Sequence, residues 1–241
     1  MGSSVVVMRL HRFYVSQPLG EEVVIADVSI VKQWAKVFRY KKGDFVVLFN
    51  GNGEDITYCI DTITSNSCIL TLTERTNSYI ANKNVTLYLS IIKKDNFELV
   101  VQKATELGVT SIIPILSERS EKKGLNEKRL NKIAIESSEQ CGRGDIPTVL
   151  PIVPLSNVLD ATTPHDIMYV LQMNGTPWKE NEKQEQFINS KNVALFVGPE
   201  GGWSDDEEKL FKDKKFTAIS LGKTTLRAET AAIIGCAFVI Q

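Results

Sequence analysis

The chain has little of several residue types, and each shortage argues against a class of protein. Its 241 residues include only four cysteines and two histidines. The cysteines have no C-x-x-C spacing, which argues against a zinc site and against a disulfide framework. Unpaired thiols are typical of a reducing compartment, so we expect a cytoplasmic protein without a metal. The residues concerned are Cys59, Cys68, Cys141, Cys236, His11 and His165.

An excess of charge and long apolar segments are also missing. The formal net charge is −1, and residues 1–80 hold 8 basic and 8 acidic side chains. No overall charge attracts a polyanion, so any RNA contact must come from a local patch. No apolar run approaches the length that spans a bilayer, and we expect no membrane partner. Met1-Gly2-Ser3-Ser4 is typical of an added leader, and we expect the natural start at Met8.

The first 80 residues predict a small β-rich domain. Residues 5–78 hold several short β-prone runs, and Ser29–Tyr40 has apolar residues at helical spacing. The stretch 50–53, Asn-Gly-Asn-Gly, is typical of a hairpin because Asn and Gly tolerate positive φ. Several strands with one helix favour a small β-barrel, and residues 76–83 read as a polar linker.

From Asn84 onward, apolar strands alternate with amphipathic helices. This alternation predicts a mainly parallel sheet covered on both faces, a doubly wound α/β fold. Two helix starts have the pattern of a capping box, in which the N-cap side chain and a Glu three residues later satisfy backbone N–H groups. One runs from Asp95 to Glu98 and the other from Ser204 to Glu207.

Two of the expected strands end at glycine. Val193–Val197 breaks into Gly-Pro-Glu-Gly-Gly at 198–202, and the run 219–221 ends at Gly222. Ligands of open α/β sheets bind at the carboxyl ends of strands, so these loops predict a cleft. An isolated glycine-rich loop is about as often a plain turn. The pattern G-x-G-x-x-G is absent, and Thr217 stands where a P-loop needs glycine, which argues against a nucleotide-binding metabolic enzyme.

Charged residues supply the remaining candidates. Arg227 and Glu229 begin an otherwise apolar helix just after the second glycine loop, and burying them there would be costly, so we expect them to line the cleft. The β-rich part has two basic clusters, and each of them taken alone is most simply ordinary surface charge. Together they are the best phosphate-contact candidates. These clusters are Arg9, His11 and Arg12, and Lys36, Arg39, Lys41 and Lys42.

Five motifs, one of them in two parts, resemble one family. Phe196–Gly202 and Leu221–Ala231 resemble the second and third motifs of the SPOUT class of S-adenosylmethionine-dependent RNA methyltransferases. Three further stretches resemble the RsmE family within that class. They are Met8–Tyr14, the pair Gln102–Val109 and Ser117–Ser120, and Glu139–Arg143. The resemblance covers the chain from about Met8 to its end.

The resemblance implies a fold and an activity. The fold is a trefoil-knotted α/β SPOUT methyltransferase domain at 84–241, preceded by an RNA-binding PUA-like β-barrel at 8–78. The family methylates N3 of one uridine in 16S ribosomal RNA of the small ribosomal subunit, with S-adenosylmethionine in the knot of a homodimer. The alternatives are a SPOUT enzyme that acts on transfer RNA or on ribose, and a non-catalytic RNA-binding assembly protein.

The resemblance also implies residue roles. We expect Arg227 to position the cofactor or the uracil and to stabilise charge as N3 loses its proton. Glu229 is the first candidate for the proton acceptor and Glu200 the second. The expected RNA contacts are Arg9, Arg12, Arg119 and Arg143. The expected cofactor contacts are Leu171, Val197, Gly198, Pro199, Glu200, Gly201, Gly202, Leu221, Gly222, Leu226 and Thr230.

Overall fold

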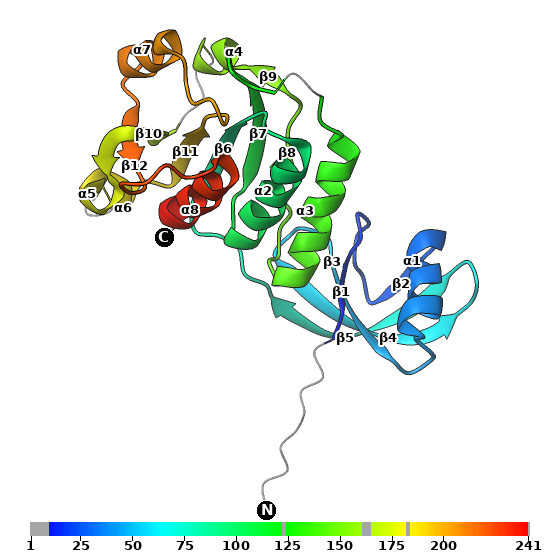
Figure 1. Ribbon diagram of the computed structural model, residues 1–241. Helices are drawn as coiled ribbons and strands as arrows, with labels where there is room; N and C mark the ends of the chain where they lie inside the picture. Colours follow the sequence, from blue (N-terminus) through cyan, green and yellow to red (C-terminus); the bar gives the residue numbers. More distant parts are fainter. Residues whose placement is uncertain (1–9, 122–123, 161–164, 182–183, 241) are drawn as a thin grey trace, which may run out of the picture. The chain divides into compact units, whose positions relative to one another are not determined.

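The computed structural model describes residues 10–121, 124–160, 165–181 and 184–240 (Figure 1). Contacts divide the chain into two compact units. The first comprises the residues up to Ile80 together with Glu139–Asp145, and the second comprises Ala81–Ser138 and the residues from Ile146 onward. The sequence predicted a single boundary between residues 78 and 84. It gave no sign that Glu139–Asp145 belongs to the first unit.

The first unit is built on a five-stranded sheet with the order β1-β3-β4-β5-β2. β1 and β3 are parallel, and the other neighbours are antiparallel. The expected hairpin turn at 50–53 lies between β3 and β4. Trp34 and Tyr58 are fully buried in the core of this unit. The strands are β1 (Arg12–Tyr14), β2 (Glu22–Ile25), β3 (Phe45–Phe49), β4 (Glu54–Ile63) and β5 (Cys68–Asn77).

The expected helix of this unit is present in two parts. α1 (Val28–Gln33) continues directly into a π-helical turn, η1 (Trp34–Phe38). The side chain of Asp27 caps α1 by accepting hydrogen bonds from Ser29 and Ile30, and these bonds hold the pKa of Asp27 below its usual value. η1 ends at Arg39, whose φ of 58° is uncommon for a residue with a side chain.

The second unit contains a parallel sheet with the order β12-β10-β11-β6-β7-β8, and β9 also pairs with β7. Every pair in it is parallel, which confirms the expectation from the sequence. β10, β11 and β12 are neighbours, so their loops meet at one edge. The strands are β6 (Asn84–Ser90), β7 (Ser111–Leu116), β8 (Thr148–Val149), β9 (Val153–Pro154), β10 (Ile167–Pro177), β11 (Asn192–Val197) and β12 (Thr217–Ser220).

Helices cover both faces of this sheet, because side chains alternate along the buried strands. Leu195 of β11 packs in the cluster formed with α2 (Lys94–Leu107), α3 (Glu127–Cys141) and α8 (Ala228–Ile240). Its neighbour Phe196 packs on the other face, with α4 (Leu155–Asp160) and α7 (Asp205–Asp213). Two short helices, α5 (Trp178–Asn181) and α6 (Glu185–Asn189), follow β10. Over the described ranges, every helix is too short or too polar to cross a membrane.

The two expected capping boxes have different outcomes. At α7 the box is complete: Ser204 accepts a hydrogen bond from the N–H of Glu207, and the Glu207 carboxylate accepts one from the N–H of Ser204. At α2 the prediction is wrong. The helix begins two residues early, Lys93 is its N-cap, and no side chain caps it locally. The N–H of Lys93 instead donates to Oε1 of Glu200, at 3.4 Å, from the first glycine loop.

Candidate functional site

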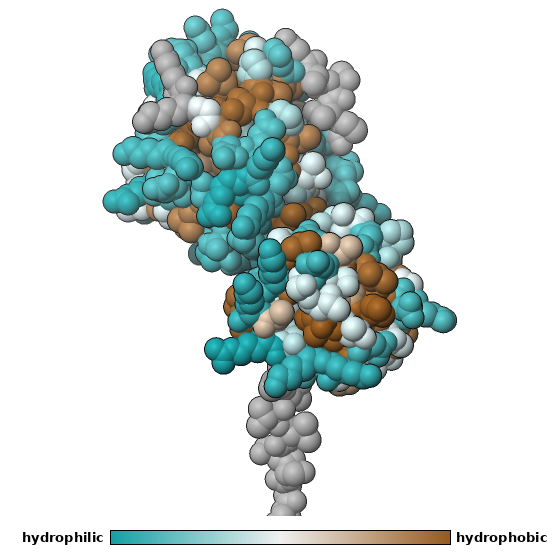
Figure 2. Space-filling model, turned by 90° about the vertical axis from the view of Figure 1, so that its right-hand side faces the viewer, coloured by the Kyte–Doolittle hydropathy of each residue, from teal (hydrophilic) through white to brown (hydrophobic). Residues whose placement is uncertain are grey.

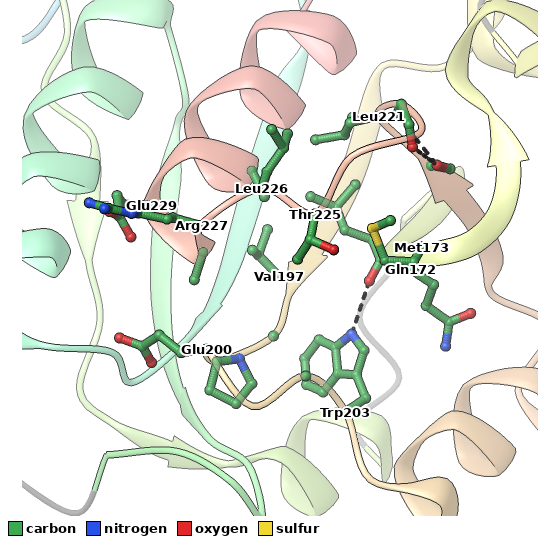
Figure 3. Close-up of a pocket in the computed structure, with 18 of the residues that line it drawn as sticks. Gln172, Met173, Val197, Glu200, Trp203, Leu221, Thr225, Leu226, Arg227 and Glu229 are labelled. Carbon is green, nitrogen blue, oxygen red and sulfur yellow. Dashed lines mark hydrogen bonds between the residues drawn. The ribbon is translucent and has the colours of Figure 1, made fainter.

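A cavity of about 1010 Å³ lies at the carboxyl ends of β10, β11 and β12 (Figure 3). Its walls come from the start of α2, the irregular part of β10, the glycine loop after β11, and the β12–α8 connection with the first turn of α8, and Glu208 of α7 also contributes. This is the edge where the sequence predicted a cleft. Arg227 and Glu229 gather on one side of it in Figure 3, and Gln172 and Met173 lie on the opposite side.

Glycine is favoured at two positions of the loop after β11, for separate reasons. A Cβ atom on Gly198 would lie 3.1 Å from the indole ring of Trp203, which is tighter than nine in ten real contacts, so the ring would have to shift. Gly202 has a φ of 67° and donates its N–H to the carbonyl of Pro199, at 2.9 Å, to close a turn. The loop therefore brings bare backbone to the cavity.

Trp203 forms a wall of the cavity. Its side chain is 6% exposed, and its Nε1 donates to the carbonyl of Leu171 at 3.2 Å, as drawn in Figure 3. That bond ties the loop after β11 to β10. Trp203 is also a core residue, since its ring packs on Phe211.

Arg227 and Glu229 both line the cavity, but their surroundings differ. Arg227 is exposed and makes no ion pair within the described ranges. Glu229 is 8% exposed, in the first turn of α8, and its Oε2 has no hydrogen-bond partner among the described residues. A buried carboxylate oxygen without a donor is costly, so this atom is ready to accept a hydrogen bond from a ligand.

Most of the expected cofactor contacts lie together around this cavity. Gly201 and Thr230 are the exceptions, because neither is part of its lining. The expected residues that line it are Leu171, Val197, Gly198, Pro199, Glu200, Gly202, Leu221, Gly222 and Leu226.

The lining also includes residues that the sequence reasoning missed. Lys93 and Asn96 contribute from the start of α2, and Gln172, Met173 and Asn174 from the irregular part of β10. A signal existed for the first pair, since α2 follows the buried strand β6 and the carboxyl ends of parallel strands share one edge. Nothing in the sequence marks the β10 residues.

The expected RNA contacts have different positions. Arg9 lies outside the described residues. Arg12 and Arg143 are in the interior of the first unit: their side chains are 8% and 3% exposed, and they pair with Asp55 and Asp145. Their guanidinium groups are bonded to internal carboxylates, and a contact of these two arginines with RNA stays a prediction.

Arg119 is exposed, but its Nη1 donates to two carbonyl oxygens of the first glycine loop, those of Gly201 at 3.1 Å and Trp203 at 3.0 Å. No group of three or more potential metal-ligating side chains comes together in the part of the chain that the structure describes.

Comparison with known proteins shows the class of protein to which the chain belongs. Residues 80–240 match the family model of an RNA methyltransferase domain, and residues 35–73 match that of an RNA methyltransferase PUA domain. The chain is 32% identical to ribosomal RNA small subunit methyltransferase E of Rickettsia conorii, over 95% of each chain. It is 29% identical to the protein of the same name from Synechocystis, over 98% of this chain and 78% of that one.

A solved structure agrees with the sequence matches. It is the crystal structure of a ribosomal RNA small subunit methyltransferase E from Neisseria gonorrhoeae bound to S-adenosyl methionine, with 30% identity and a TM-score of 0.83 over 95% of this chain and 96% of that one. The chain therefore belongs to the family of RNA methyltransferases that includes ribosomal RNA small subunit methyltransferase E.

Proposed function

We propose that the protein methylates N3 of a uridine in 16S ribosomal RNA of the small ribosomal subunit, with S-adenosylmethionine as the methyl donor. The observation that carries this proposal is the cavity at the strand ends, where glycine-exposed backbone faces a buried glutamate and an exposed arginine. The relatives named for methylation of small-subunit ribosomal RNA, and the relative bound to S-adenosyl methionine, support the same reaction class.

The residues present fit the cofactor. Ligand pockets typically measure roughly 300–1,000 Å³, so a cavity of about 1010 Å³ has room for the cofactor and for a base beside it. The backbone at Gly198 and Gly222 would lie against the adenine, and Leu226 against its apolar faces. When bound, S-adenosylmethionine supplies a methyl group on a positively charged sulfur, which a nitrogen lone pair can attack.

Glu229 and Arg227 have separate roles in activating the uracil. Uracil N3 carries a proton at neutral pH and must lose it to become a nucleophile. We assign that proton to the unpartnered Oε2 of Glu229. The cationic side chain of Arg227 lines the same cavity and stabilises the negative charge that develops on the uracil as the N3–H bond breaks. The uridine must leave any base stack to enter, which costs least in RNA that is already unpaired.

The RNA is held in part by the first unit. Arg12 and Arg143 are buried and the exposed Arg75 pairs with Glu54, so the other exposed cations among the described residues of that unit are Lys32, Lys36, Arg39, Lys41 and Lys42, in α1, η1 and the turn before β3. They lie in sequence around Val37, whose side chain is 69% exposed. Figure 2 shows this kind of surface on the first unit, an apolar area bordered by hydrophilic side chains. A group of exposed cations suits contact with the phosphates of RNA.

The assembly is also a proposal. α8 is apolar along nearly its whole length, and Ile234 and Ala237 on it are only half-buried. An all-apolar helix normally has neighbours on every side, so we propose that a second copy of the chain covers this face in a homodimer. We further propose that the segment around β12 and α8 forms the trefoil knot of the SPOUT class, and that the protein acts in the cytoplasm.

The test is methyl transfer to small ribosomal subunits that lack this modification, with the product nucleoside identified by mass analysis. We expect 3-methyluridine. Methylation of transfer RNA or of a ribose oxygen would keep the reaction class and reject the substrate. Cofactor binding with no transfer to any RNA would favour a non-catalytic assembly protein.

A further inference from the structure

The loop that follows β7, Ser117–Ser120, is anchored firmly to the sheet. The hydroxyl of Ser117 lies 3.0 Å from that of Ser90, at the end of β6, and 2.7 Å from that of Ser120. All three serines are buried, and the N–H of Glu121 donates to the carbonyl of Ile91 at 2.9 Å. A loop fixed at both ends to the central strands is a rigid support.

Arg119 extends from this support to the first glycine loop. Its Nη1 donates to the carbonyl oxygens of both Gly201 and Trp203, and its own Cβ and Cδ lie 3.4 and 3.5 Å from the position of a Cβ on Gly201. Hydrogen bonds from a charged donor are stronger than neutral ones. One side chain therefore fixes two of the loop's peptide groups.

Glu207 makes a second connection from the same support. Its Oε1 accepts the N–H of Glu118 at 2.8 Å, and its Oε2 accepts the N–H of Ser204 at 2.9 Å. The side chain is 8% exposed, so water screens these bonds little. The capping box of α7 is thus also a link between the β7 loop and the residue that follows the cavity wall.

These two links hold the backbone at Trp203, the residue that forms a wall of the cavity. Trp203 receives the Arg119 bond at its carbonyl and directly precedes Ser204, its ring packs closely against Gly198, and its Nε1 donates to the carbonyl of Leu171. A shift of the Trp203 peptide would disturb the contact of its indole ring with Gly198 or its hydrogen bond to Leu171 of β10. The shape of the cavity therefore depends on contacts made outside it.

We propose that Arg119 and Glu207 are positioning residues that hold the first glycine loop in its cofactor-binding form, so that Arg119 acts on the cofactor through the loop and not on RNA. The inference rests on the proposed cofactor. It assigns Arg119 a role different from the phosphate contact that the sequence suggested.

The experiment compares Arg119→Ala, Arg119→Lys and Glu207→Gln with the wild type and with a matched control, Arg129→Ala. Arg129 is another exposed arginine of this unit, and its ion pair is with Glu98 of α2 and not with the glycine loop. Binding of S-adenosylmethionine is measured by calorimetry, and binding of a 16S ribosomal RNA fragment is measured at several salt concentrations.

We expect Arg119→Ala to weaken cofactor binding about tenfold, the effect of losing charge-assisted hydrogen bonds, with the larger change in KM for the cofactor and not in kcat. Arg119→Lys keeps one donor and should recover part of the loss. Glu207→Gln should weaken binding in the same direction, and Arg129→Ala should leave it unchanged. The salt dependence of RNA binding should be the same in all of them.

Hydrogen exchange gives a readout that needs no ligand. The amide protons of Gly202 and Ser204 should exchange faster in Arg119→Ala and in Glu207→Gln than in the wild type. An unchanged cofactor affinity with a flatter salt dependence in Arg119→Ala would overturn the inference and return Arg119 to the RNA interface. If the wild type itself binds no S-adenosylmethionine, the proposed function fails, and the exchange rates still decide whether the two residues hold the loop.

Discussion

Arg12 and Asp55 are joined by two parallel hydrogen bonds, from Nε to Oδ2 at 2.7 Å and from Nη2 to Oδ1 at 2.6 Å. The same guanidinium lies over the ring of Phe49 at 4.3 Å and donates to the carbonyls of Glu139 and Arg143. One buried cation therefore connects β1 and β4 with the segment Glu139–Asp145, and it is a structural element of the first unit.

Asp55→Ala should lower the free energy of unfolding by about 3 kcal/mol, because it leaves the Arg12 charge buried without its carboxylate. Denaturant unfolding measures this. Glu54→Ala is the matched control: Glu54 precedes Asp55 and pairs with Arg75, but both of those side chains are about 40% exposed, so the loss should stay within about 1 kcal/mol. Equal effects of the two substitutions would remove Arg12 from this central role.

Gly144→Ala should destabilise the same region through its backbone. A Cβ there would lie 2.6 Å from the Cβ of Ser78 and 2.9 Å from the Cα of Gly53, so two segments would have to separate. The segments around Gly53 and Gly144 are joined directly, because the N–H of Gly53 donates to the carbonyl of Gly144 and the N–H of Gly144 donates to the carbonyl of Tyr79. We expect a loss of at least about 2 kcal/mol, in the range of overpacking.

Gly124→Ala makes the same chemical change where no atom lies within 4 Å of the new Cβ. It should leave the unfolding midpoint unchanged or raise it slightly. Similar midpoints for the two variants would mean that the Glu139–Asp145 segment contributes little to the first unit.

Local patterns predicted the local features of this fold, and contacts distant in sequence account for the failures. The run 193–197 could be identified as a strand, and Ser204 as a cap, because neighbouring residues determine both. The start of α2 was predicted wrongly because the group that accepts from the N–H of Lys93 is Glu200, more than a hundred residues away. In the sequence, Arg12 has the pattern of a surface cation, since its partner Asp55 lies on another strand.

The residues of the candidate site also fall into those that local sequence patterns predict and those that they do not. The glycine loops, Arg227 and Glu229 could be selected because strand ends and an apolar helix start are visible in sequence. Gln172, Met173 and Asn174 could not, because they line the cavity only through a register shift between β10 and β12. The loop contacts of Arg119 depend on the tertiary position of two backbone carbonyls, which carries no sequence signature.

Replacing Lys36, Lys41 and Lys42 together with glutamine should weaken binding of ribosomal RNA and flatten its salt dependence. Each phosphate contact contributes roughly 0.7–0.9 to the slope of log affinity against log salt, so the slope should fall by roughly 2 to 3. All three side chains are exposed, and the fold should remain intact. Filter binding over a salt series measures the slope.

Lys128, Lys209 and Lys212, replaced together, provide the control, because they are exposed lysines on α3 and α7 and remove the same charge. An equal flattening by both triple variants would indicate general charge attraction and reject a specific RNA surface on the first unit.

His165 should make the second unit less stable in acid. Its ring lies 3.2 Å from the hydroxyl of Tyr88, and burial lowers the pKa of His165 below its usual 6.5, although Asp166 opposes the shift. Below about pH 6.5 the unfolded chain therefore binds more protons than the folded one, and stability is lost as the pH falls.

Melting temperatures at pH 8 and pH 5 test this expectation. His165→Gln should reduce the difference between them, whereas His11→Gln, at the exposed histidine, should keep the wild-type difference. The same pH dependence in all three proteins would exclude His165 as its source.

Arg227→Ala should lower kcat for methyl transfer about a hundredfold while cofactor affinity changes little, because the side chain is assigned to charge that develops only as N3 loses its proton. Glu229→Gln should also lower kcat, and the loss should shrink as the pH rises, since hydroxide then replaces the missing proton acceptor.

Lys223→Ala is the control: it removes a cation from the same β12–α8 connection, at a position that is exposed and not part of the cavity lining. Single-turnover methylation with saturating cofactor measures kcat for each variant. Full activity of Arg227→Ala would show that the charge is stabilised elsewhere, and the first residues to examine would then be Lys93 and Asn96, which line the same cavity.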